Sequence, residues 1–268
     1  MTQLAAIAAR SLLAFGVLLF VLQLVAHEIG YRAGLWFAAR RGAQTDVVGV
    51  VVGGMLGLLA FVLALTLSFA NTGFSERRAG TLAEANAIST AWLRAEAIGP
   101  PRGDEIARLL EQYTHLRIAF IQAEDEPGAL DELNQRSNAL QTQIWGHAST
   151  LARERPDAVI ASLMASLNDT FDMTTAARFA YGLRLPPELL GLLIGMALIS
   201  MAALGYQMGL RRNQLHALAA LLTLMWTVVI FDIIDLASPR SGALRTSAAV
   251  YEWTLQSFHG GVPIPPPP

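Results

Sequence analysis

The sequence predicts an all-α protein with four membrane spans and a helical extramembrane insertion between spans 2 and 3. Of its 268 residues, 53% are hydrophobic and only 15% are charged, whereas about a quarter of the residues in an ordinary soluble domain are charged. A span needs about 20 consecutive apolar residues. Four windows meet this length, at residues 7–26, 47–70, 185–208 and 215–234. We therefore expect a multi-pass membrane protein.

The first two windows form an N-terminal membrane hairpin, residues 1–73. The first window resembles a signal peptide, but it is long and has no clear cleavage site with small residues before Gly30, so we interpret it as a retained signal anchor. His27 and Glu28 follow this window directly. They suit either a solvated helix end or a metal or proton site, and we favour the solvated end because functional charges should lie deeper in the membrane.

The second window carries small residues along one helical face. At about 100° per residue, the face collects residues that begin as glycine and end as polar. Its members are Gly49, Gly53, Gly57, Ala60, Ala64, Ser68, Asn71 and Ser75. Small residues let helix backbones pack closely in lipid, and small or polar residues also line ion pores. The residues alone favour packing for the whole face, including Gly49, Gly53 and Gly57, and leave pore contact as the alternative. If the face lines a pore, its pore-lining candidates are Ala64, Ser68, Asn71 and Ser75.

Residues 74–184 have the composition of a soluble helical domain. Charges return, and apolar residues recur with a helical period in three segments that follow the breaker at residues 99–103. The helix of the second span is expected to continue toward Ile98 before this breaker. We therefore predict a helical extramembrane insertion with a hydrophobic core of its own.

The last two windows form a C-terminal membrane hairpin, residues 185–236. Its first helix carries two pairs of glycines four residues apart, a spacing that favours close helix contact. The pairs are Gly191 with Gly195 and Gly205 with Gly209. The remaining residues, 237–268, form a tail whose terminal proline tract is expected to be extended and mobile.

Asp232 and Asp235 lie one helical turn apart at the end of the fourth span. Carboxylates at the negative end of a helix dipole need cationic partners or a bound ion. Salt bridges to Arg77, Arg78, Arg240 or Arg245 are the favoured arrangement, and a cation site is the alternative.

Several classes of function are disfavoured by the composition. The chain has no cysteine and a net charge of −2, so thiolate chemistry is excluded and nucleic acid is not an expected partner. No serine–base, paired-acid or histidine-rich constellation and no phosphate-binding glycine loop is evident. We expect no enzyme activity, no catalytic residues, no cofactor and no metal site.

Two stretches resemble a known family. Residues 69–96 and 232–245 are similar to the bestrophin-like proteins of bacteria and plants, which are catalogued chiefly as a domain of unknown function. The matching positions are Arg77, Glu84, Ala85, Asn86, Ala87, Leu93 and Arg94 in the first stretch, and Asp232, Asp235, Pro239, Arg240 and Gly242 in the second. The order of spans and insertion agrees over nearly the whole chain.

The more distant likeness to the bestrophins themselves lies in architecture. Bestrophins are pentameric ion channels whose second spans line the pathway, so the resemblance implies an oligomeric ion-conducting protein, with span 2 lining the path. The implied partners are membrane lipid, inorganic ions and further copies of the chain, with a pentamer as one possibility. Asp232 and Asp235 alone do not reproduce the acidic calcium-binding cluster of that family.

The resemblance also implies a junction between the membrane and the insertion. Its candidate junction or gating residues are Arg77, Arg78, Glu84, Asn86, Arg94, Asp232, Asp235 and Arg240. We expect Glu84 and Asn86 to bind Arg77, Arg78 or Arg94, either to lock this junction or to coordinate an ion.

The expected location is a bacterial inner membrane, with the insertion in the cytoplasm. The alternative function is a non-transporting membrane signalling or scaffold protein whose helical insertion binds a partner.

Overall fold

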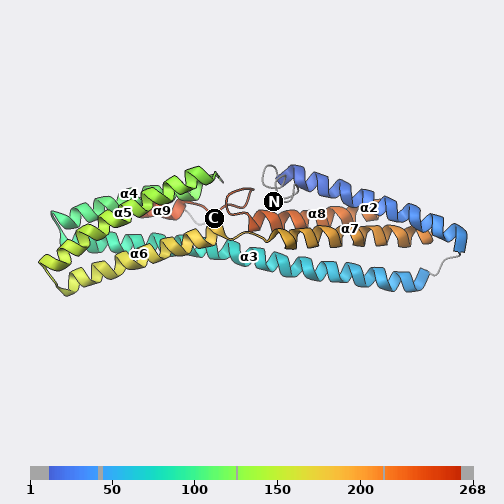
Figure 1. Cartoon of the computed structure of the whole chain (residues 1–268), viewed down its shortest axis with the longest axis horizontal. Coiled ribbons are helices and arrows are strands. Elements are labelled where there is room, and N and C mark those ends of the chain that lie inside the picture. Colours follow the sequence, from blue (N-terminus) through green and yellow to red (C-terminus); the bar gives the residue numbers. More distant parts are fainter. Residues whose placement is uncertain (1–11, 42–44, 125, 214, 261–268) are drawn as a thin grey trace. The chain divides into compact units, whose positions relative to one another are not determined.

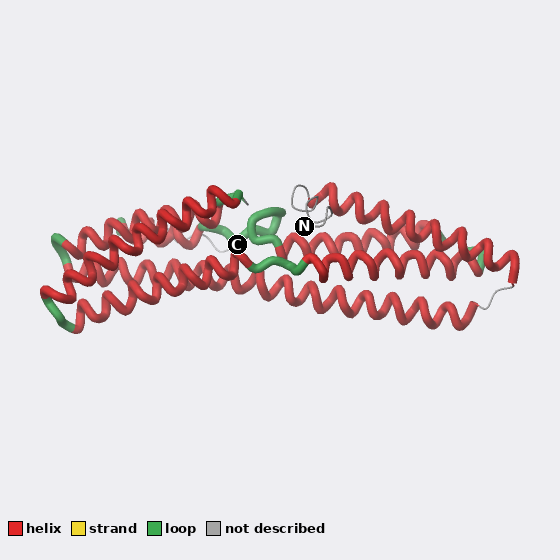
Figure 2. Tube along the Cα trace, viewed as in Figure 1, coloured by secondary structure: helices red, strands yellow, loops and turns green. Residues whose placement is uncertain are grey.

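The computed structural model describes residues 12–41, 45–124, 126–213 and 215–260, and within them the chain is helical with no strand (Figure 2). The elements are α2 (Leu12–Arg41), α3 (Thr45–Ile98), α4 (Arg102–Gln122), α5 (Pro127–Glu154), α6 (Ala158–Gly182), α7 (Pro187–Leu210), α8 (His216–Ala237) and α9 (Ala249–Phe258). Four helices of the described chain are long and apolar enough to cross a membrane. The predicted all-α, four-span fold is confirmed. Residues 7–11 of the first predicted span and the proline tract lie outside the described residues.

The chain divides into two compact units. We call residues 1–72 with 184–238 the membrane unit, and residues 73–183 with 239–268 the extramembrane unit. Helix α3 has 54 residues and contributes to both, because its first half belongs to the membrane unit and its second half to the other (Figure 1).

Helices α2, α7 and α8 pack closely in the membrane unit. The backbones of α2 and α7 meet at four glycines: a Cβ at Gly30 would lie 1.9 Å from the carbonyl oxygen of Ala202, and one at Gly205 would lie 2.0 Å from that of His27. Gly34 and Gly209 repeat the arrangement one turn along. The glycines therefore fix how these two helices are aligned.

The position of His27 shows that its assignment to a solvated helix end was wrong. Helix α2 continues past the predicted end of the first span to Arg41. His27 is only 4% exposed within it, because it lies on the side of α2 that packs against α7. It is thus a buried residue of the bundle and not part of a solvated helix end.

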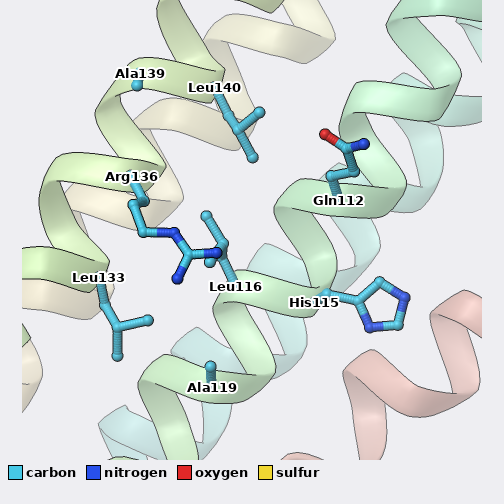
Figure 3. A pocket seen from close by; sticks show the side chains of 8 residues that line it. All are labelled: Gln112, His115, Leu116, Ala119, Leu133, Arg136, Ala139 and Leu140. Carbon is cyan, nitrogen blue, oxygen red and sulfur yellow. The ribbon is translucent and has the colours of Figure 1, made fainter. Parts of the chain in front are cut away.

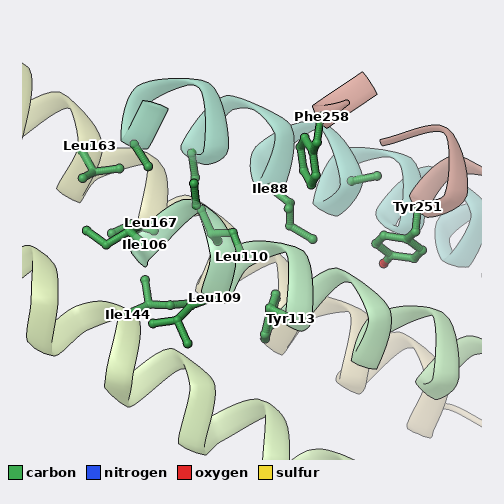
Figure 4. Packing of buried hydrophobic residues seen from close by; sticks show 14 of the residues in the cluster. Ile88, Ile106, Leu109, Leu110, Tyr113, Ile144, Leu163, Leu167, Tyr251 and Phe258 are labelled. Atoms are coloured by element: carbon green, nitrogen blue, oxygen red, sulfur yellow. The ribbon is translucent and has the colours of Figure 1, made fainter. Parts of the chain in front are cut away.

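The extramembrane unit has its own core, as the helical period predicted (Figure 4). The second half of α3 packs with α4, α5, α6 and α9 around side chains such as Ile88, Leu110 and Ile144, each 0% exposed. Asp157 caps α6 by accepting hydrogen bonds from the backbone amides of Val159 and Ile160.

Helix α9 was not indicated by the sequence interpretation. It lies in the segment predicted as a tail, yet Tyr251 is 0% exposed and Phe258 is 7% exposed. The ring of Phe258 stacks on Trp92 with a centroid separation of 4.5 Å. Part of the tail therefore completes the core of the extramembrane unit.

Candidate functional site

Most of the small face of α3 points away from the other described helices of the chain. Ala64, Ser68, Asn71 and Ser75 are exposed, and a Cβ added at Gly53 or Gly57 would meet no atom within 4 Å. The buried side of α3 in the membrane unit is instead formed by Val52, Leu59, Leu63, Thr66 and Ala70. Among the described residues, the small face is thus uncovered from Gly53 to Asn71, whereas Gly49 approaches α7.

A second exposed face of α3 is bulky and apolar. Leu58, Leu65 and Phe69 are 56%, 56% and 64% exposed. Helix α3 therefore presents two chemically different surfaces, one suited to lipid and one that becomes polar toward Asn71.

The most extensive buried polar cluster of the described chain surrounds Glu84 in the extramembrane unit. Nε of Arg117 lies 2.6 Å from Oε1 of Glu84, and both side chains are 0% exposed. Nη2 of Arg117 donates a hydrogen bond to Oε2 at 3.1 Å. This ion pair joins α3 to α4 inside the core.

Two hydroxyl groups complete the surroundings of the Glu84 carboxylate. Tyr251 of α9 donates to Oε2 at 2.6 Å, and Thr174 of α6 donates to Oε1 at 2.8 Å. Tyr113 hydrogen-bonds to Thr174 and accepts a hydrogen bond from Gln141 of α5 at 2.9 Å. The network around this carboxylate thus connects α3, α4, α6 and α9 directly, and α5 through Tyr113.

The cluster around Glu84 keeps Arg117 charged and Tyr251 protonated. Burial alone would lower the pKa of Arg117, but the adjacent Glu84 carboxylate outweighs this and raises the pKa, so the guanidinium stays charged. Burial and the charge of Glu84 raise the pKa of Tyr251, which keeps its proton and remains a donor.

A second buried arginine lies beside this cluster. The guanidinium carbon of Arg240 lies 4.4 Å from the centroid of the Phe120 ring, and that of Arg117 lies 4.3 Å from the same centroid. Nη1 of Arg240 donates to the backbone oxygen of Phe120 at 2.5 Å. Arg240 therefore ties the segment after α8 to the C-terminal end of α4.

These contacts change the partners expected for the junction residues. Glu84 binds Arg117, Thr174 and Tyr251 and not the predicted arginines, while Asn86 and Arg78 are exposed. Arg94 donates to the backbone oxygen of Ser162 at 2.7 Å. Arg77 is 3% exposed. The prediction that Glu84 binds Arg77, Arg78 or Arg94 is wrong, because Arg117 of α4 supplies the cation.

Asp232 and Asp235 occupy different environments. Asp235 is 3% exposed, whereas Asp232 is exposed. One turn of α8 separates them, but only one carboxylate faces the protein interior. The two acids therefore do not form one shared site within the chain.

The predicted packing glycines also separate into two groups. Gly205 and Gly209 meet the α2 backbone, and Gly49 approaches Nε2 of Gln207, which would lie 3.0 Å from an added Cβ. Gly191 and Gly195 have no atom within 4 Å of an added Cβ, as Gly53 and Gly57 do not. Any packing of these four must involve another chain.

The sequence matches the Bestrophin-like domain family over residues 8–251. The chain belongs to this family. A crystal structure of a bacterial bestrophin homolog from Klebsiella pneumoniae, obtained by Zn-SAD phasing, has a TM-score of 0.66 at 17% identity and covers 94% of this chain and 100% of the homolog. A variant of a bacterial bestrophin homolog from the same organism gives 0.69 at 14% identity, with coverages of 91% and 99%. No curated protein matches. At these identities the likeness shows a shared fold.

Sequence reasoning about this bestrophin-like chain missed three features. Arg117 follows Tyr113 by four residues on the buried face of α4, so its spacing could have indicated burial. Gly30 and Gly34 have the same spacing as Gly205 and Gly209. The buried residues of α9, Tyr251, Thr254 and Phe258, also follow a helical period.

A surface groove lies between α4 and α5 (Figure 3). It has a volume of about 530 Å³ and is lined by apolar side chains with three polar ones. The polar members are Gln112, His115 and Arg136. Among the residues the structure describes, no three histidine, aspartate or glutamate side chains gather in a way that could hold a metal ion.

Proposed function

We propose that this bestrophin-like chain is a subunit of an oligomeric ion channel in which α3 lines the conduction path. The observation that carries the proposal is the uncovered small face of α3, which ends in Ser68 and Asn71. The resemblance to bestrophins supports it, because their second spans line the pore.

The chemistry of the face favours a watery path over lipid. An asparagine amide in hydrocarbon loses its hydrogen bonds to water, which costs on the order of several kcal/mol. In a pore the same amide contacts water and the passing ion. The bulky face, with Leu65 and Phe69, is correspondingly suited to lipid or to a neighbouring subunit.

The cluster around Glu84 supports a role in holding the pore helix. Because Arg117, Thr174 and Tyr251 all bind one residue of α3, the part of α3 in the extramembrane unit is held on three sides. We propose that this anchoring, together with the junction residues Arg77, Arg78, Asn86, Arg94, Asp232, Asp235 and Arg240, sets the conducting state. A bacterial inner membrane, a cytoplasmic extramembrane unit and a homo-oligomer, pentameric by resemblance, belong to the same proposal.

Ion flux into liposomes tests the channel. Purified protein should pass small inorganic ions across lipid vesicles. The substitutions Ala64→Leu and Ser68→Leu should each reduce flux by at least about tenfold, because a larger apolar side chain narrows and dries the path.

Leu65→Met is the matched control, since Leu65 is 56% exposed on the bulky face of the same helical turn. Its flux should stay within about twofold of the unmodified protein, because volume-conserving apolar exchanges are well tolerated. Equal loss in the control and in Ser68→Leu would contradict pore lining by the small face. A correctly assembled protein without flux would favour the non-transporting scaffold.

A further inference from the structure

Helix α2 buries a polar face that the proposed conduction path does not use. Gln23, His27 and Tyr31 follow one another at intervals of four residues and are 0%, 4% and 8% exposed. This face turns toward α7 and α8 and includes the backbone contacts of His27 and Tyr31 with Gly205 and Gly209. Three polar side chains therefore lie inside the membrane unit, away from the small face of α3.

The close approach of α2 and α7 places an imidazole beside a thioether. Nε2 of His27 lies 3.5 Å from Sδ of Met208. This separation suits two ligand atoms of one metal ion, since nitrogen and sulfur ligands each lie about 2.0–2.3 Å from a bound ion such as zinc.

A second imidazole comes from the start of α8. The ring centroid of His216 lies 6.0 Å from that of His27, in an edge-to-face arrangement. Tyr31 packs edge-on against His216 with a centroid distance of 4.9 Å. His216 is exposed, so a metal ion could reach the site from outside the bundle.

We propose that His27, Met208 and His216 form a binding site for a soft monovalent metal ion of the Cu(I) class. Thioether and imidazole ligands together select Cu(I) over harder cations. The nearby carboxylate of Glu28 is engaged with Nε of Arg32 at 2.7 Å, so the site does not gain the oxygen ligand that Zn(II) commonly takes.

One buried polar atom on this face of α2 lacks a hydrogen-bond partner among the described residues. Nε2 of Gln23 donates to Oγ1 of Thr227 at 3.0 Å, but Oε1 of Gln23 is buried and has no hydrogen-bond partner in the described structure. A buried polar atom without a partner is costly. One turn from His27, this oxygen is a candidate for the outer layer of groups that orient metal-bound histidines.

Competition for Cu(I) tests the site in the purified full-length protein. The chain should withdraw one Cu(I) per subunit from a chromophoric Cu(I) chelator. Met208→Leu and His27→Asn should each weaken binding at least about tenfold by removing one ligand. X-ray absorption of the Cu(I)-loaded protein should show a sulfur neighbour that Met208→Leu abolishes.

Met225→Leu is the matched control, because Met225 of α8 is 58% exposed. This substitution should leave the affinity for Cu(I) within about twofold of that of the unmodified protein. Met208→Leu preserves volume and should keep the fold, which size-exclusion profile and melting temperature verify. Cu(I) binding that is no tighter than in the His27→Asn, Met208→Leu double variant would overturn the proposal. So would equal weakening by Met225→Leu, or tighter binding of Zn(II) than of Cu(I). Ion flux enters none of these measurements, so the site and the channel are tested independently.

Discussion

Arg117 and Glu84 form a buried pair in which each side chain depends on the other. Arg117→Met should destabilise the protein by about 3–5 kcal/mol, because it leaves the Glu84 carboxylate buried without its cation. Unfolding in detergent, followed by the fluorescence of Trp92, Trp145 and Trp253 in the extramembrane unit, measures the loss.

A double variant separates the charge effect from packing. Glu84→Gln combined with Arg117→Met removes both charges and should recover most of the lost stability, since a neutral pair can replace a buried ion pair at little cost. If the single Arg117→Met variant stays within about 1 kcal/mol of the unmodified protein, the ion pair does not hold the cluster together.

Deprotonation of Tyr251 should limit the stability of the extramembrane unit at alkaline pH. Its folded-state pKa is raised by burial and by Glu84, whereas a tyrosine in an unfolded chain has a pKa of about 10. A raised pKa contributes stability that is present below the unfolded value and is lost as pH rises above it. The extramembrane unit should therefore lose stability steeply above about pH 10.

Tyr251→Phe checks this limit. It removes the hydrogen bond to Glu84 and should cost about 1.5–3 kcal/mol at neutral pH. It should also flatten the loss of melting temperature between about pH 10 and 11. An unchanged slope would show that other groups set the alkaline limit.

The sequence identifies Glu84 as a candidate but not the residue that binds it. The resemblance singled out Glu84, but its partner Arg117 is 33 positions away on a helix whose rotation about its axis depends on packing. Arg117 could be recognised as facing inward from its spacing to Tyr113. Which carboxylate it would meet could not, because that depends on how α3 and α4 cross.

At the scale of elements, α2 and α7 interlock through glycines. Gly205→Ala should destabilise the membrane unit by about 2 kcal/mol or more, because the new methyl group would lie 2.0 Å from a backbone oxygen of α2 and the helices must separate. Melting temperature in detergent measures the effect.

Gly191→Ala is the control on the same helix. An added Cβ there meets no atom within 4 Å, so its effect within a subunit should stay within about 0.5 kcal/mol. A similar loss at both positions would mean that the backbone contact with α2 does not explain the effect of Gly205→Ala.

The helices themselves were largely predictable, and their pairing was not. The spans and the three insertion helices follow from apolar length and period. The spacing of Gly205 and Gly209 indicates a close contact, but Gly30 and Gly34 become the identified partners only when α2 and α7 are seen together. Helix α9 was not predicted, because it is only 10 residues long and follows a long irregular connection.

At the scale of the whole molecule, the sidedness of the protein can be tested directly. The chain has no cysteine, so a single introduced thiol reports its position without background. Asn138→Cys in the extramembrane unit should react with a membrane-impermeant maleimide only after the cells are permeabilised. Asn213→Cys, between α7 and α8, should react in spheroplasts with an intact inner membrane.

Both positions are exposed, so differences in labelling report sidedness and not burial. The reverse pattern would place the extramembrane unit outside the cytoplasm. Arginines occur in the short connections, such as Arg40 and Arg211, and also beside the insertion, such as Arg77 and Arg184. The positive-inside rule needs a clear excess, so the sequence favours neither orientation strongly. The small face of α3, in contrast, could be recognised from residue size, and Ala64, Ser68 and Asn71 on it are exposed in the structure.

The contact between Gln23 and Thr227 has a consequence for biogenesis. The two side chains are 204 positions apart, and a chain grows at about 5–20 residues per second. The first span therefore waits on the order of 10–40 s after synthesis before its polar face finds α7 and α8. During that time the side chains of Gln23 and His27 lack their contacts with α7 and α8, so we expect the first span to become stably packed only after the last span has been made.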